Sequence, residues 1–324
     1  MRILKTIPLL LLFILIAAGC SAGENNSATK EDKLTIYTSI YPIQYAVERI
    51  GGDTVSARTV FPPGVDAHSY EPTSKDMTSI ADSSAFIYMG AGMEGFAESA
   101  ADALASQDVS LIEIGVHDEL FHSEDEHGHV HESDTENGHE EDVSHDGHNH
   151  GDHNPHIWID PIRMIDMAEI IKEELITLNP TEETLYNENF AALEADLQKL
   201  DKQFTEVLSN KSDKHILVTH AAYGYWEERY GIEQIAINGL SSSSEPSQKD
   251  LTKIIDQAKE NDLNYIIFEQ NSSNRVSEII QEEIGAESLT IHNLAVLTEE
   301  DIMNSEDYFS LMEHNLEVLD KVTN

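Results

Sequence analysis

One long amphipathic segment near the middle of the chain limits how the rest of it can fold. Apolar residues recur there at spacings of three and four, forming a stripe made of Leu193, Leu197, Leu200, Phe204 and Leu208. This spacing predicts a helix with one buried face. Asn179 and Pro180 precede it as an expected cap and first-turn proline, so we expect the helix over residues 179–209. A helix of ~28 residues is ~42 Å long, enough to run along two lobes.

Short apolar runs of strand type lie on both sides of this segment. They are residues 34–38, 55–61, 85–89, 111–114 and 156–159 before it, and 216–219, 234–237, 265–268 and 289–291 after it. Helical patterns separate most of these runs, and this alternation predicts α/β units with mainly parallel sheets. About 290 residues are also too many for one ordinary core. We therefore expect two α/β lobes, 34–178 and 210–324, joined by the long helix.

The first 33 residues do not fit this fold. Residues 1–19 have a basic start and a short apolar run, which is typical of a signal peptide. Small residues then precede Cys20, as in a bacterial lipoprotein processing site; the alternative is a plain secretory signal with a bystander cysteine. Residues 20–33 are small and polar and are expected to form a lipidated tether. We thus expect an extracytoplasmic protein anchored through lipid on Cys20 to the bacterial cell membrane.

Residues 122–153 interrupt the α/β pattern of the first lobe. They contain nine of the sixteen histidines of the chain and eleven acidic residues, without any Lys or Arg. This composition cannot bury a core and predicts a disordered insertion. Dense imidazole and carboxylate groups favour many weak metal sites, although a merely solubilising acidic loop is the alternative.

The net charge of -42 also argues against nucleic acid and anionic membrane surfaces as partners.

Three histidines outside the insertion lie beside predicted strands. His68 follows a strand and a Pro-Pro-Gly turn, His220 ends the strand 216–219, and His156 opens the strand 156–159. Ligands of α/β sheets bind beyond the carboxyl ends of strands, a rule that His68 and His220 follow and His156 does not. A lone histidine at a strand end is more often structural than a ligand, so the surrounding sequence has to decide.

Four ordered segments surround these histidines and carry a family resemblance. They are Phe61–Pro72 (FPPGVDAHSYEP), Asn154–Pro161 (NPHIWIDP), Val218–Tyr225 (VTHAAYGY) and the Glu-Pro-Ser run from Glu245. Together with the His-rich insertion, they resemble the zinc-specific solute-binding proteins of ABC transporters, the cluster A-I or class III binding proteins. The resemblance covers essentially the whole chain after the tether. It implies two α/β lobes bridged by a long, rigid helix, with a metal ion between the lobes.

The same resemblance implies a specific ligand set. His68 and His156 from the first lobe and His220 from the second would bind one ion. Manganese and iron relatives carry a carboxylate at the third position, whereas three neutral imidazoles suit Zn²⁺. The implied function is a monomeric receptor that captures Zn²⁺ and delivers it to the permease of an ABC uptake transporter, without catalysing a reaction.

The fourth ligand is where this chain departs from the family pattern. Some zinc-binding relatives place a glutamate where this chain has Ala67, and others place a carboxylate at the position of Ala295. We therefore expect water as the fourth ligand, with His292 or Glu269 as the alternatives. If it is not a ligand, Glu269 is expected to cap a turn or helix of the second lobe.

Other functions stay open from the sequence. A manganese- or iron-binding protein of the same fold and a surface adhesin are both compatible with it. Three histidines plus water is also the arrangement of catalytic zinc, which suggests a hydrolase as a further alternative. Against the hydrolase, the chain has no His-Glu-x-x-His helix, no Gly-x-Ser-x-Gly elbow and no phosphate-binding glycine loop.

Overall fold

The computed structural model describes residues 33–122, 153–241, 246–271 and 275–324. The predicted signal peptide with Cys20, most of the tether, residues 123–152 of the insertion and Glu245 of the last motif lie outside these ranges. Lys33–Asn324 form one compact unit. None of the helices in the described ranges combines the length and hydropathy that crossing a membrane requires.

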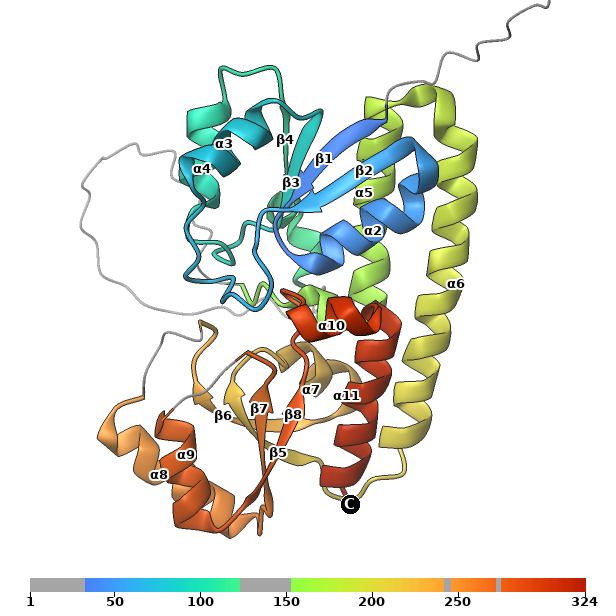
Figure 1. Ribbon diagram of the computed structural model, residues 1–324. Helices are drawn as coiled ribbons and strands as arrows, with labels where there is room; N and C mark the ends of the chain where they lie inside the picture. The colour runs from blue at the N-terminus through green and yellow to red at the C-terminus, as the bar shows by residue number, and fades with distance from the viewer. Residues whose placement is uncertain (1–32, 123–152, 242–245, 272–274) are drawn as a thin grey trace, which may run out of the picture. The chain divides into compact units, whose positions relative to one another are not determined.

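Two four-stranded sheets organise the described residues (Figure 1). The strands of the first sheet are β1 (Leu34–Thr38), β2 (Val55–Thr59), β3 (Ala85–Tyr88) and β4 (Ser110–Glu113), in the order β2-β1-β3-β4. Those of the second are β5 (His215–His220), β6 (Glu233–Asn238), β7 (Tyr265–Glu269) and β8 (Glu287–Ile291), in the order β6-β5-β7-β8. Every pairing in both sheets is parallel, and both sheets repeat one topology. The predicted class of two α/β lobes with parallel sheets is confirmed.

Helices connect the strands in each lobe. The α-helices of the first half are α2 (Tyr41–Gly51), α3 (Ser74–Ala81), α4 (Ala97–Leu104), α5 (Pro161–Leu178) and α6 (Glu183–Leu208). Those of the second half are α7 (Gly224–Tyr230), α8 (Gln248–Glu260), α9 (Arg275–Ile284), α10 (Glu299–Asn304) and α11 (Tyr308–Val322). Short 3-10 helices lie at Gly52–Thr54, Ile114–Val116, Asp118–Leu120, Ile157–Ile159 and Pro180–Glu182.

Helix α6 is the long helix that the sequence predicts between the two strand groups. All five residues of the predicted stripe are buried, and Tyr186 and Phe190 extend the stripe toward the amino end. The helix packs against α5 and α2 of the first lobe and against α11 and α7 of the second, so it joins both lobes (Figure 1). Its start differs from the prediction. Pro180 opens a separate 3-10 turn, and Asn179 accepts a hydrogen bond from the Thr181 hydroxyl instead of capping the helix.

One predicted strand is wrong. Residues 156–159 form a 3-10 helix at Ile157–Ile159, and this part of the chain pairs with neither sheet. The backbone turns there because Ile157 N donates to Pro155 O at 2.9 Å and Asp160 caps the following helix α5. A short buried apolar run does not distinguish a strand from a buried turn by periodicity alone.

The lobes share one hydrophobic core. A single cluster of buried side chains runs from the first sheet through α5 and α6 to Trp226 and Tyr308 of the second lobe, while a smaller cluster fills the space between the second sheet, α8 and α9. Hydrogen bonds also cross between the lobes. Trp226 Nε1 donates to Ile159 O at 2.9 Å, and Trp158 Nε1 donates to Asn293 O at 2.8 Å. The lobes are therefore joined by buried contacts as well as by α6.

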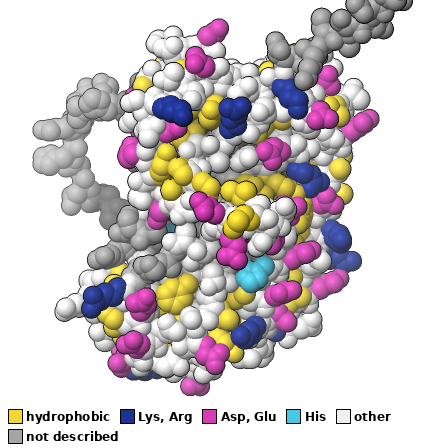
Figure 2. Space-filling view, in the orientation of Figure 1, with side chains coloured by type: hydrophobic (Ala, Val, Ile, Leu, Met, Phe, Trp, Pro, Cys, Tyr) yellow, Lys and Arg dark blue, Asp and Glu magenta, His cyan; other side chains and the backbone are white. Residues whose placement is uncertain are grey.

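Acidic side chains are spread over the face of the molecule that is visible in Figure 2. Figure 2 shows Asp and Glu scattered over the visible face, with no single acidic patch. This distribution agrees with the net charge of -42 being mainly a property of the solvated surface.

Candidate metal centre

His68 is held in the loop that follows β2. The turn before it depends on Gly64, whose φ of +73° is readily adopted by glycine and whose N–H donates to Leu297 O at 2.9 Å. Asp66 Oδ1 then accepts from His68 N at 2.8 Å. The imidazole Nε2 is buried without a partner, so it is available as a ligand atom.

His156 is buried immediately before the 3-10 helix at Ile157–Ile159. Asn154 Oδ1 accepts from both the backbone N and the ring Nδ1 of His156, at 3.1 and 2.7 Å. Because Nδ1 carries the hydrogen in this arrangement, Nε2 keeps a lone pair. That Nε2 is buried and has no partner. The Trp158 ring packs 5.2 Å from the imidazole, between centroids, and fixes its orientation further.

His220 ends β5 and is bonded at both ring nitrogens. Nδ1 donates to Glu269 Oε1 at 2.9 Å, and Nε2 donates to the Leu240 carbonyl at 2.7 Å. The Tyr223 hydroxyl also donates to Glu269 Oε1 at 3.1 Å, and Asn293 Nδ2 donates to Glu269 Oε2 at 2.9 Å. Both partners of the ring are acceptors, so His220 is in its doubly protonated form in this arrangement.

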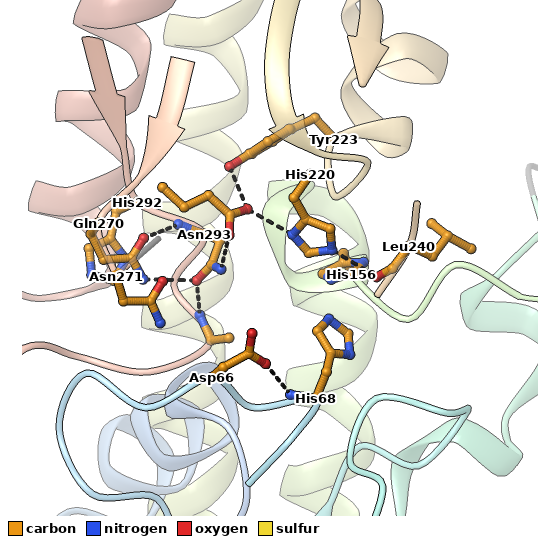
Figure 3. Close-up of polar contacts among 12 residues, drawn as sticks. Asp66, His68, His156, His220, Tyr223, Leu240, Gln270, Asn271, His292 and Asn293 are labelled. Atoms are coloured by element: carbon orange, nitrogen blue, oxygen red, sulfur yellow. Dashed lines mark hydrogen bonds and ion pairs between the residues drawn. The ribbon is translucent and has the colours of Figure 1, made fainter. Parts of the chain in front are cut away.

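The three imidazoles meet where the two lobes join (Figure 3). One ligand atom from each of His68, His156 and His220 lies within 4.8 Å of the other two. The ring centroids are 5.3 Å apart for His68 and His156, 5.4 Å for His68 and His220, and 4.8 Å for His156 and His220. Tetrahedral zinc with bonds of ~2.05 Å requires nitrogen separations of ~3.3 Å, so small ring movements would complete a site. Among the described residues, no other group of three or more potential ligands is this close.

The electrostatic environment differs among the three rings. Burial, followed by the charges of His220 and His68, holds the pKa of His156 well below 6.5. Burial and then His220 also lower the pKa of His68. Burial acts in the same direction on His220, but the Glu269 charge and the hydrogen bonds to Glu269 and Leu240 outweigh it and raise the pKa of His220. Two rings are therefore neutral near pH 7, whereas the third is stabilised as a cation.

The two side chains considered as a fourth ligand are outside this group. The contacts of the Glu269 carboxylate with other described residues are to His220, Tyr223 and Asn293, and its capping of a turn or helix stays a prediction. His292 uses both ring nitrogens elsewhere. Its Nδ1 accepts from Leu294 N at 2.9 Å, and its Nε2 donates to Asp301 Oδ2 at 3.1 Å. Neither alternative brings a further ligand atom to the three histidines in this structure.

Sequence reasoning missed the residues that orient the rings. It did not foresee Asn154 as the partner of His156, Glu269 as the partner of His220, or the Leu240 carbonyl. One signal was present: Asn154 precedes His156 by two residues, and Asp213 binds His215 in the same way, through both N and Nδ1 at 3.1 and 2.7 Å. An Asn or Asp two residues before a histidine can thus fix its ring.

The family described as zinc-uptake complex component A, periplasmic, matches residues 36–322. The chain belongs to this family. Zinc-binding lipoprotein AdcA of Streptococcus pneumoniae is 33% identical to it over 331 residues, which cover 99% of this chain and 61% of that protein. The chain thus spans less than two thirds of this relative. The high-affinity zinc uptake system protein ZnuA of Bacillus subtilis is 29% identical over 309 residues, covering 95% of this chain and 93% of that protein.

Solved structures agree with this membership. The Zn(II)-bound ZnuA-like domain of Streptococcus pneumoniae AdcA superposes with a TM-score of 0.71 at 32% identity, covering 90% of this chain and 99% of that domain. The family resemblance and the two-lobe fold expected from the sequence are both confirmed.

Proposed function

We propose that this chain is the extracytoplasmic receptor of an ABC-type zinc uptake transporter. In this proposal His68, His156 and His220 bind one Zn²⁺ between the lobes, and the permease then receives the ion. The observation that carries the proposal is the pair of buried, unpartnered Nε2 atoms on His68 and His156, close to a third histidine from the other lobe. Buried polar atoms without partners are uncommon and call for an explanation, which a metal ion supplies.

The donor set supports zinc as the cargo. Among the described residues, the group contains imidazoles and no carboxylate. Neutral nitrogen ligands favour Zn²⁺ over the harder Mn²⁺. The proposed fourth ligand is water, and the carboxylate of Glu269 orients His220 from the opposite ring nitrogen. The names of the relatives, which describe zinc binding and zinc uptake, support the same ion and a transport role rather than catalysis.

The remaining parts of the proposal rest on the sequence. Cys20 would carry the lipid anchor, with residues 20–33 as tether, and the lobes would comprise residues 34–178 and 210–324. The His-rich segment would gather zinc weakly near the tight site, and the chain would act as a monomer. Substituting Cys20→Ala should move the protein from the membrane fraction to the soluble fraction; retention at the membrane would contradict lipid anchoring.

Zinc titration of the metal-stripped protein tests the ligand assignment. The protein should be studied with and without residues 123–152, so that weak sites can be counted separately. We expect one tight zinc in both forms and several additional weak ions only when the segment is present. His68→Ala, His156→Ala and His220→Ala should each abolish tight binding, whereas His314→Ala, which removes a histidine outside the group, should not. Tight binding by the triple alanine variant, or its loss on deleting the segment alone, would overturn the proposal.

A further inference from the structure

A buried asparagine of the second lobe binds the carboxylate that contacts His220. Asn293 is 8% exposed and lies two residues beyond Ile291, the end of β8. Glu269 ends the neighbouring strand β7 and is in register with Ile291. Asn293 Nδ2 donates to Glu269 Oε2 at 2.9 Å, while Glu269 Oε1 accepts from His220 Nδ1 at 2.9 Å. The two oxygens of one carboxylate thus connect Asn293 to a proposed zinc ligand.

The orientation of the Asn293 amide is fixed by its other neighbours. Its Oδ1 accepts from Ala295 N at 3.0 Å and from Gln270 Nε2 at 3.0 Å (Figure 3). Because the Ala295 N–H can act only as a donor, the oxygen of the amide must face it. Gln270 Oε1 also accepts from Asn293 N at 3.0 Å, so one side chain holds both the backbone and the amide of Asn293. The nitrogen Nδ2 is therefore the atom that faces Glu269, as a donor.

The Glu269 carboxylate needs a donor on each oxygen to keep one orientation. The terminal torsion of a glutamate side chain is broad, so bonds to a single oxygen leave the plane of the carboxylate free to turn. His220 Nδ1 and the Tyr223 hydroxyl both bind Oε1, whereas Asn293 binds Oε2. Glu269 is also only 5% exposed, and a buried carboxylate depends on donors from the protein. A fixed carboxylate keeps Nδ1 as the bonded nitrogen of His220 and leaves Nε2 as the atom for an ion.

The segment around Asn293 is held independently through its backbone. Asn293 O accepts from Trp158 Nε1 of the first lobe at 2.8 Å. On α11, Asn315 donates to His292 O and accepts from His292 N, both at 2.7 Å. Because these bonds use backbone atoms of the segment, truncating the Asn293 side chain removes the bond to the carboxylate while these contacts remain possible.

We propose that Asn293 is a positioning residue for zinc binding. Its amide holds the Glu269 carboxylate in the plane that orients His220, so that His220 presents Nε2 to the ion. This inference rests on the proposed function, because Asn293 acts through one of the proposed ligands. Groups that orient a metal ligand commonly change metal affinity about 10- to 100-fold when they are removed. Asn293 acts one bond further from the ion, so we expect an effect of about tenfold.

A double-mutant cycle between Asn293 and Glu269 tests the proposal. Zinc affinity is measured in the metal-stripped full chain, in competition with a chelator that removes zinc from weak sites. We expect Asn293→Ala to weaken tight binding about tenfold. In a Glu269→Ala background the same substitution should weaken binding by less than about twofold, because the bond it removes no longer exists. Fully additive effects would show that Asn293 does not act through the carboxylate and would overturn the proposal.

Asn315→Ala is the matched control. It removes a fully buried asparagine that is bonded to the same segment, at His292, but not to Glu269. Any effect of Asn315→Ala on zinc affinity should be the same with and without the Glu269 carboxylate. If Asn315 were coupled to Glu269 as strongly as Asn293 is, any disturbance of the segment would suffice, and the specific role of Asn293 would be refuted.

Proton NMR of the metal-free chain gives a second readout that stability alone does not move. The proton on His220 Nδ1 is bonded to Glu269, which shifts its signal downfield. This signal should move upfield in Asn293→Ala, where the carboxylate can turn, and should stay in place in Asn315→Ala. An unshifted signal in Asn293→Ala would contradict the proposal.

The outcomes separate this inference from the proposed function. Tight zinc binding that requires His220 but is unchanged in Asn293→Ala would overturn the role of Asn293 alone. Tight binding that is unchanged in His220→Ala would overturn the proposed function itself. Should Asn293→Ala fail to fold, hydrogen exchange in the unmodified metal-free chain decides. The Nδ2 protons of Asn293 should then exchange with solvent more slowly than those of the exposed Asn304, and equally fast exchange would refute the proposal.

Discussion

The two lobes contribute unequal halves to the metal centre. The first lobe supplies His68 and His156, whose Nε2 atoms are buried without partners, and the Nδ1 of His156 is bound to the neutral amide oxygen of Asn154. The second lobe supplies His220, whose Nδ1 is bound to a carboxylate and whose Nε2 is bound to the Leu240 carbonyl. The first half is thus ready to accept an ion, whereas the second is satisfied without one.

This difference indicates how occupancy can be coupled to structure and to pH. An ion that binds all three rings must break the bond between His220 Nε2 and Leu240 O and displace one proton. The same ion meets no such competition at His68 and His156, where desolvation already disfavours the proton. Zinc binding therefore competes with a proton and a hydrogen bond at His220 but not at His68 and His156. Substitutions at the two sets of residues can measure these contributions to zinc affinity separately.

Removing a proposed ligand should have the largest effect and should differ between the halves. His68→Ala and His220→Ala are each expected to weaken zinc binding about a thousandfold, since one of three protein ligands is lost. The metal-free proteins should differ in stability. His220→Ala leaves Glu269 short of a donor and should cost about 1–3 kcal/mol, whereas His68→Ala removes a ring with an unsatisfied atom and should cost less. Chelator competition measures the loss of zinc affinity, and thermal unfolding measures the stability of the metal-free proteins. Equal losses of metal-free stability in His68→Ala and His220→Ala would contradict the difference between the two lobes.

The pH dependence of zinc binding should reflect the protonation of His220 almost alone. A ligand must be neutral, and the pKa of His220 is raised above 6.5 while those of His68 and His156 are lowered. Below the raised pKa, affinity should fall about tenfold per pH unit, and above it affinity should level off. Over roughly two units this amounts to about 100-fold. Competition titrations across the range should give a slope near one. A slope near three would mean that the first-lobe rings are also protonated.

Glu269→Gln should reduce the difference in protonation between His220 of the second lobe and the two histidines of the first lobe. The Glu269 charge is the largest cause that raises the pKa of His220, so the substitution should lower this pKa. A smaller fraction of His220 is then protonated, and zinc has to displace the proton from fewer molecules. We expect affinity to fall about tenfold at pH 8, where an oriented and basic ligand matters most, and less at pH 6. The slope of affinity against pH should become shallower. Glu278→Gln on α9 removes an exposed charge of the same lobe and serves as the control, for which no change is expected. An unaltered slope of zinc affinity against pH in Glu269→Gln would show that Glu269 does not control the protonation of His220.

The sequence predicted the fold more completely than it predicted this asymmetry. Apolar periodicity located all eight described strands and the long helix, because burial of a helix face or a strand leaves a regular pattern. It failed at residues 156–159, where a buried turn and a buried strand share the same apolar composition. Helix α6 was recovered through its stripe, but its first turn was not, because Asn179 and Pro180 also suit a separate 3-10 turn.

Within the site, the three histidines could be found from their motifs, but their partners could not. Glu269 is 49 residues from His220 and meets it only because β5 and β7 are neighbours in the second sheet. A backbone carbonyl such as that of Leu240 has no signature in side-chain identity. Asn154 is different: it acts on His156 from two residues away, so its role is encoded locally.

The Asn154–His156 pair allows the comparison between the two lobes to be tested with the smallest expected effect on zinc binding. Asn154→Ala removes the acceptor at His156 Nδ1 and should weaken zinc binding several-fold without changing the pH slope, because burial still lowers the pKa of His156. Asn154→Asp keeps the acceptor but adds a charge, as Asp213 does for His215. It should raise the pKa of His156 and increase the slope of affinity against pH from about one toward two. Combined with Glu269→Gln, it should move the proton from the second lobe to the first. If the slope in Asn154→Asp stays at about one, the charge of the partner is not what distinguishes the two halves.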